Sequence, residues 1–151
     1  MASALNFGKI LAAFDGSEFS VRAVEAASAL AVTGGSELVV IHVYSAPGIA
    51  YAGAPGIPVP SFPEYEEAMK EDAQKTLSRG VQVAVKAGAR ARGVLLEAPS
   101  AVQAIVEFAA AEKVGLIVSG TRGMGNFKRL VLGSVSSGLV GHAACSVLVV
   151  R

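Results

Sequence analysis

Short apolar runs alternate with longer amphipathic segments along the whole chain. Each run is too short for a globular helix and is bounded by glycine or polar turn residues, and most are rich in β-branched side chains. Such runs are typical of strands that are buried on both faces, because these need no polar positions. The expected strands cover residues 9–15, 37–44, 93–98, 116–119 and 146–151.

The segments between these runs carry apolar residues at helical spacing. In the first segment, Ser17 or Ser20 is expected to cap a helix that runs to about Thr33, where two glycines stop it. Regular alternation of strand and helix predicts a single α/β domain, in which a doubly wound, Rossmann-like parallel sheet has helices on both faces. The further helices are expected over 64–87, 100–113 and 134–142.

One connection is unusually long. Residues 45–63 contain five of the six prolines, which excludes a regular helix or strand there. A loop of this length in a compact domain is typically either functional or mobile. A lid over a ligand and a crossover without order of its own therefore both stay open for this segment.

Composition and charge narrow the function classes. The formal net charge is +1 and the cations are dispersed apart from Arg122, Lys128 and Arg129, so no face for nucleic acid is expected. The first residues lack a secretory signal, and no apolar segment approaches the roughly 18 residues of a membrane span. Cys145 is the single cysteine, which excludes an internal disulfide. We expect a cytoplasmic protein that binds neither nucleic acid nor membranes.

The segment 120–134, GTRGMGNFKRLVLGS, holds four glycines and three cations without an acid. Its first glycines have the spacing of a P-loop, but Asn126 occupies the position of the required lysine. A dinucleotide fingerprint fails as well, because Lys128 stands where its third glycine belongs. Neither standard phosphate loop is present.

The chemistry of this segment nevertheless fits an anion. Gly120 and Gly123 can bring the backbone close to a ligand and can adopt positive φ. Gly133 leads into a helix whose first N–H groups are unpaired and carry the positive end of the helix dipole. The alternative is a plain connector with a serine N-cap and exposed cations. Further donors and cations nearby are Ser134, Ser136, Arg122 and Lys128.

Asp15 ends the first apolar run, beside Gly16 and Ser17. Alone, such an aspartate is most simply an Asx turn or a helix cap. Its carboxylate could also accept hydrogen bonds from a ribose hydroxyl or a base amine. Because ligands of doubly wound sheets bind beyond the carboxyl ends of the strands, Asp15 and the glycine segment together favour a ligand.

Signs of catalysis are weak. No serine stands in a nucleophile elbow, and His42 and His142 lie far apart in sequence, so each is interpreted as structural. No residues have metal-ligand spacing, although Mg²⁺ or Mn²⁺ could be carried in with phosphates. No general base is placed to activate water. We expect no catalytic residues and little or no hydrolysis, with weak ATPase activity or autophosphorylation left open.

The final run, Ser146–Val150, is apolar throughout and would lie at an edge of the sheet. An exposed edge of this kind is a liability, which pairing with a second copy would remove. We therefore expect a homodimer through this strand, with a short or capped edge as the alternative.

Residues Gly120, Gly123, Gly133 and Ser134 reproduce the pattern G-x2-G-x9-G-S, which resembles the ATP-binding signature of the universal stress proteins. The likeness spans essentially the whole chain. KILAAFDGSEFS resembles the family's opening strand and aspartate turn, LVVIHVY its second strand, and the segment from LIVSGTRG to the end its closing third.

This resemblance implies a five-stranded sheet in the order 3-2-1-4-5, with ATP, ADP or AMP across strands one and four. Asp15 would contact the nucleoside, and a backbone group of Val43 would read the adenine edge. The glycines would line the ribose and phosphates, with Gly133, Ser134 and Ser136 at the outer phosphates. The full expected set is Ala13, Asp15, Ser17, Val43, Gly120, Arg122, Gly123, Gly133, Ser134, Val135 and Ser136.

The resemblance favours a dimeric, nucleotide-dependent switch or binding module in a stress response, with unidentified protein partners. Two other functions stay open. One is an enzyme of the related adenine-nucleotide α-hydrolase type, for which the chain offers no second substrate domain. The other is a dimeric scaffold that does not bind ATP.

Overall fold

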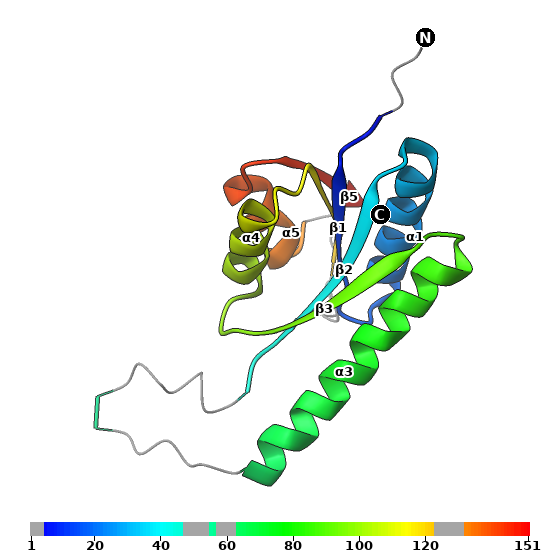
Figure 1. The fold of residues 1–151 in the computed structure, drawn as a ribbon. Coiled ribbons are helices and arrows are strands. Elements are labelled where there is room, and N and C mark those ends of the chain that lie inside the picture. The colour runs from blue at the N-terminus through cyan, green and yellow to red at the C-terminus, as the bar shows by residue number, and fades with distance from the viewer. Residues whose placement is uncertain (1–4, 47–54, 57–62, 123–131) are drawn as a thin grey trace.

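A computed structural model describes residues 5–46, 55–56, 63–122 and 132–151, and it contains one parallel sheet between two layers of helices (Figure 1). The strands are β1 (Lys9–Ala13), β2 (Glu37–Tyr44), β3 (Ala91–Glu97), β4 (Leu116–Gly120) and β5 (Ser146–Val150). The helices are α1 (Glu18–Gly34), α3 (Pro63–Lys86), α4 (Ala101–Ala111) and α5 (Ser134–His142).

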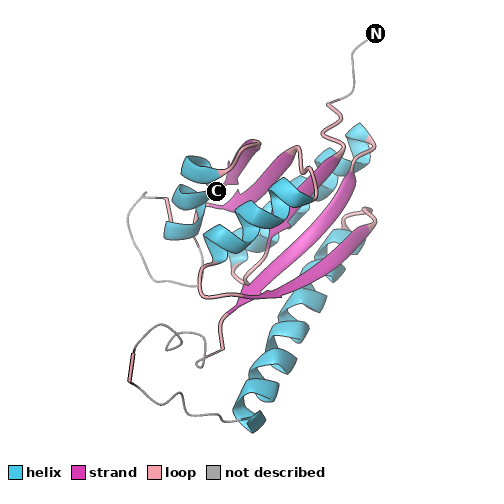
Figure 2. Cartoon of the chain, turned by 60° about the vertical axis from the view of Figure 1, so that its left-hand side comes forward, coloured by secondary structure: helices cyan, strands magenta, loops and turns pink. Residues whose placement is uncertain are grey.

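The sheet has the order β3-β2-β1-β4-β5 with every pair parallel, so the expected fold class and strand order are confirmed. Figures 1 and 2 show α1 and α3 on one face and α4 and α5 on the other. The chain builds outward from β1 to β3 and then returns to lay β4 on the opposite side of β1. The direction of winding therefore reverses between β1 and β4, where doubly wound sheets bind ligands.

The core explains why the strands read as continuous apolar runs. Ile10 and Ala12 of β1 pack with Val24 under α1 and α3, whereas Leu11 packs with Ile117 under α4 and α5. All five side chains are 0% exposed. Because consecutive strand residues point to opposite faces, helices on both faces favour apolar side chains at nearly every strand position.

The predicted elements are all present, and some of their boundaries differ. β2 and α5 have the predicted bounds, but β1 ends at Ala13 rather than Asp15, and β3 begins at Ala91 rather than Gly93. Ser17, rather than Ser20, is the N-cap of α1, and its hydroxyl accepts a hydrogen bond from the Ser20 N–H at 3.2 Å. Sequence patterns locate an element better than its ends, because turn geometry decides where pairing stops.

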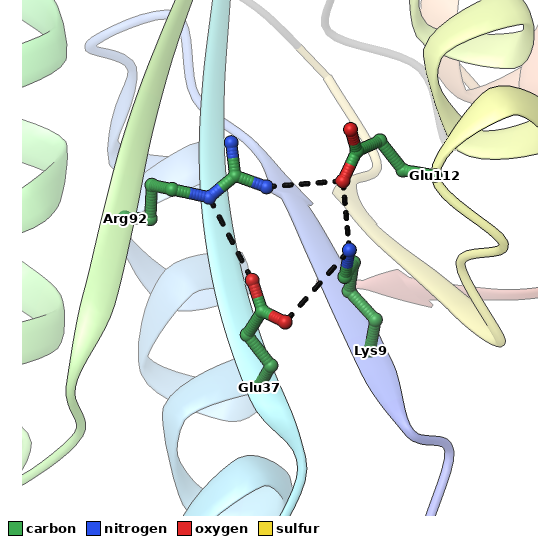
Figure 3. Close-up of polar contacts among 4 residues, drawn as sticks. All are labelled: Lys9, Glu37, Arg92 and Glu112. Atoms are coloured by element: carbon green, nitrogen blue, oxygen red, sulfur yellow. Dashed lines mark hydrogen bonds and ion pairs between the residues drawn. The ribbon is translucent and has the colours of Figure 1, made fainter.

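An ion-pair network joins the amino ends of three strands to the end of α4 (Figure 3). Lys9 Nζ lies 2.7 Å from Glu112 Oε2 and 3.7 Å from Glu37, and Arg92 lies 3.2 Å from Glu112 and 3.6 Å from Glu37. The hydrogen bond from Lys9, with the charges of Lys9 and Arg92, lowers the pKa of the Glu112 carboxyl. The positive and negative charges of the network balance. It lies at the end of the sheet opposite the expected ligand site.

Most of the proline-rich connection, residues 47–54 and 57–62, lies outside the described residues. The two alternatives for it, a lid and an unstructured crossover, lie there as well. α3 then begins at Pro63, where proline suits the first helical position. None of the helices in the described ranges has the length and hydropathy needed to cross a bilayer.

Candidate functional site

The turn after β1 holds Asp15 in a defined position. Asp15 Oδ1 accepts a hydrogen bond from the Ser17 N–H at 2.9 Å, and the Asp15 N–H donates to Ser20 Oγ at 3.3 Å. Gly16 between them has φ 86°, which favours glycine. The Asx turn considered above is therefore formed. A carboxylate can accept several hydrogen bonds, so this one leaves acceptor capacity for a ligand.

The end of β4 lies directly against the first turn of α1, which follows this turn. A Cβ built on Gly120 would lie 2.8 Å from the carbonyl carbon and oxygen of Phe19, in the first turn of α1. Gly120 does not use its freedom to adopt positive φ, since it is not among the described glycines with φ in that region. Glycine is needed here because the helix backbone approaches the strand, which places the Asp15 turn and the first signature glycine side by side.

The start of α5 is fastened to the same strand end. The Gly133 N–H donates to the Thr121 carbonyl at 2.6 Å. The buried Ser136 hydroxyl lies 3.2 Å from that carbonyl oxygen and 3.0 Å from the Gly133 carbonyl oxygen. The two outer parts of the glycine signature therefore meet, although residues 123–131 between them lie outside the described residues.

The N-cap of α5 is Gly133, so the serine N-cap that belonged to the plain-connector alternative is not formed. Gly133 has extended backbone angles, φ −62° and ψ 163°, and Ser134 is the first helical residue. A glycine cap has no side chain with which to cover the first N–H groups of the helix. Those donors and the positive end of the helix dipole are what an anion would meet.

β2 runs on beyond the end of β1. The last registered pair is Ala13 with Ile41, followed by a hydrogen bond from the Phe14 N–H to the Ile41 carbonyl at 2.9 Å. Val43 continues to pair with β3 on its other side. Because strand residues two apart direct their N–H and C=O to the same edge, those of Val43 point toward the space beyond β1.

Both histidines contact backbone carbonyl groups. His42 Nδ1 lies 2.8 Å from the Phe14 carbonyl oxygen, and His142 Nδ1 lies 2.9 Å from the Gly138 carbonyl oxygen. The first of these contacts sits at the candidate site, between Asp15 and Val43. Sequence reasoning gave His42 no role in the site, because a histidine inside an apolar strand has no distinguishing pattern.

Arg79 is another residue that sequence reasoning missed. Its Nη1 atom lies 3.6 Å from where a Cβ on Gly16 would stand, so α3 brings a guanidinium group to the Asp15 turn. Within α3 this arginine is simply a polar position of an amphipathic helix. No local signal could have distinguished it from the helix's other charged residues.

Of the remaining predicted residues, Gly123 and Lys128 lie outside the described residues. Ala13 and Val135 are partly buried against the core under α4 and α5, and Arg122 follows β4. Across the described part of the chain, no three His, Cys, Asp or Glu side chains are grouped so as to hold a metal ion.

Comparisons with known proteins agree with this architecture. The model of the universal stress protein family matches residues 6–151. A relative from Thermus aquaticus, "Universal stress protein in QAH/OAS sulfhydrylase 3'region", is 36% identical over 148 residues, which cover 96% of this chain and 99% of the relative.

Solved structures give the same result. The universal stress protein UspA from Lactobacillus plantarum matches with a TM-score of 0.79 at 23% identity, over 97% of this chain and 99% of that one. A universal stress protein crystallised in complex with cAMP matches with a TM-score of 0.68 at 26% identity, over 96% and 97% of the two chains. This chain belongs to the universal stress protein family.

Proposed function

We propose that the protein binds an adenine nucleotide across the carboxyl ends of β1 and β4 and acts as a nucleotide-dependent switch or binding module. The observation that carries this proposal is the place of three groups at the carboxyl ends of the neighbouring strands β1, β2 and β4. These are the carboxylate of Asp15, the outward-facing backbone of Val43 and the start of α5 at Gly133. A nucleoside needs acceptors and donors, and a phosphate chain needs N–H groups.

The relative that was crystallised with cAMP supports the ligand class. In our proposal Asp15 contacts the nucleoside and Val43 the base edge, while the start of α5 holds phosphate. The longer chain of ATP would use these donors more fully than AMP, and Mg²⁺ or Mn²⁺ would be carried with it. The proposed contacts are Ala13, Asp15, Ser17, Val43, Gly120, Arg122, Gly123, Gly133, Ser134, Val135 and Ser136.

We propose binding rather than rapid turnover. The Ser136 hydroxyl is buried and directed to backbone carbonyls, and Asp15 Oδ1 is held by the Ser17 N–H. A general base must lie within hydrogen-bond reach of the proton that it removes. Asp15 is instead suited to fixed recognition of a ligand donor.

A thermal-shift titration of nucleotide-stripped protein tests the proposal. Ligand at a hundred times Kd adds about 2.7 kcal/mol to stability, so we expect ATP with Mg²⁺ to raise Tm by roughly 5–10 °C. Mass spectrometry of natively purified protein should find a bound adenine nucleotide. Absence of both effects would contradict the proposal and favour the scaffold function. Rapid release of AMP and pyrophosphate would favour the α-hydrolase alternative.

We further propose that the protein forms a two-fold dimer through β5, which lies at the end of the sheet order. Leu148 of β5 is 37% exposed. Pairing with a second copy would cover this side chain and the free strand edge.

Leu148→Asp is therefore expected to convert a dimer to a monomer in sedimentation velocity. Val32→Asp is the control, because Val32 is an exposed apolar residue on α1, outside the β5 strand. A wild-type monomer, or a Leu148→Asp variant that remains dimeric, would contradict this interface.

A further inference from the structure

The hydrogen-bond ladder between β1 and β2 stops one step before Val43. The Phe14 N–H donates to the Ile41 carbonyl at 2.9 Å, which is the last backbone bond of this ladder among the described residues. In a regular parallel ladder, the next bond would run from the Val43 N–H to the Phe14 carbonyl. That carbonyl therefore decides whether the N–H of Val43 is used inside the sheet or left for a ligand.

The imidazole of His42 takes the position of the missing bond. His42 Nδ1 lies 2.8 Å from the Phe14 carbonyl oxygen. Phe14 is 3% exposed, and a buried carbonyl without a hydrogen bond costs free energy, so this acceptor needs a partner. With the side chain of His42 in place, Phe14 is satisfied without the Val43 N–H.

We propose that His42 is a positioning residue for base recognition, which keeps the N–H of Val43 available, beside its C=O, to the edge of adenine. This inference rests on the proposed nucleotide site. An adenine edge presents an amino donor beside a ring-nitrogen acceptor, which matches the C=O and N–H of one residue facing the same way. Hypoxanthine presents a carbonyl acceptor beside an N–H donor, which opposes both backbone groups of Val43.

The carbonyl partner determines that Nδ1 of His42 is the ring nitrogen that donates. A carbonyl oxygen only accepts, so Nδ1 must carry the hydrogen. Nε2 is left free to be either an acceptor or a donor. A substitute must therefore donate from the position of Nδ1, which the amide of asparagine reaches and the longer amide of glutamine overshoots.

The test compares His42→Leu, His42→Asn and His42→Gln with wild type by calorimetric titration with ATP, with ITP and with inorganic tripolyphosphate. We expect His42→Leu and His42→Gln to lose about tenfold in the ratio of ATP to ITP affinity, the worth of about one hydrogen bond. His42→Asn should retain most of that ratio. Tripolyphosphate has no base, so its affinity should be the same in all four proteins.

A second readout needs no ligand. Hydrogen exchange of the Val43 amide should be fast in ligand-free wild type and slower in His42→Leu, where this N–H can move onto the Phe14 carbonyl. Unchanged selectivity in all variants, with ATP bound, would overturn the role of His42 and leave the proposed function intact. A parallel loss of ATP and tripolyphosphate affinity would overturn it too, since that indicates general damage. Failure of wild type to bind any nucleotide would overturn both proposals.

Discussion

Gly120→Ala is expected to lower the free energy of unfolding by about 2–3 kcal/mol and Tm by roughly 5–10 °C. The added Cβ would lie 2.8 Å from the carbonyl carbon and oxygen of Phe19. These are backbone atoms in the first turn of α1, and they cannot turn aside as a flexible side chain can. The Ser17 cap and the bond from the Asp15 N–H to Ser20 Oγ hold that turn in place. Urea denaturation followed by circular dichroism measures the loss.

Gly141→Ala is the matched control, with the opposite sign. Gly141 lies within α5, and a Cβ there would meet nothing within 4 Å. Alanine is favoured over glycine inside a helix by about 0.5–1 kcal/mol, so this variant should be slightly more stable than wild type. Equal stability of Gly120→Ala and Gly141→Ala would contradict the tight contact between β4 and α1.

The fold could be predicted because the strands appear in the sequence as short apolar runs. Runs such as residues 37–44 are apolar on both alternating sets of positions, and only a sheet with helices on both faces buries them. The strand order, in contrast, came from the resemblance to a family. Alternation of strand and helix is equally compatible with other windings, because periodicity carries no information on which strands are neighbours.

Gly120 illustrates how a site residue can be identified for an incomplete reason. The sequence pointed to a glycine near a ligand, and the structure gives a glycine that an α-helix approaches closely. Ser136 is similar, because its hydroxyl was expected to face phosphate and is directed to two backbone carbonyls. Local sequence cannot distinguish contact with a ligand from contact with a distant segment of the same chain.

The contacts of His42 and Arg79 could not be predicted at all. Each depends on an element far away in sequence, β1 for His42 and the β1–α1 turn for Arg79. His42 faces Phe14 because β1 stops before β2 does, and the end of a ladder is a property of two strands together. Such juxtapositions appear only once tertiary packing is known.

Asp15→Asn is expected to raise the Kd for ATP by about 10- to 100-fold while leaving stability within about 0.5 kcal/mol of wild type. The asparagine side chain keeps an oxygen to accept from the Ser17 N–H, so the turn before α1 should persist. What it loses is the negative charge and the acceptor that a ribose hydroxyl or a base amine would use. Hydrogen bonds to charged groups contribute about 1.5–3 kcal/mol, which gives the expected range.

Asp15→Ala separates the two roles of this side chain. It removes the acceptor for the Ser17 N–H as well, so it should lose about 1 kcal/mol of stability in addition to ATP affinity. Unchanged ATP affinity in both variants would mean that Asp15 serves only the turn.

Titrations with 2′-deoxy-ATP and 3′-deoxy-ATP then identify the group that Asp15 contacts. If Asp15 holds a ribose hydroxyl, removal of that hydroxyl weakens binding to wild type but costs Asp15→Asn little, because the two changes delete the same interaction. If the affinity for each analogue falls equally in wild type and in Asp15→Asn, the carboxylate faces the base.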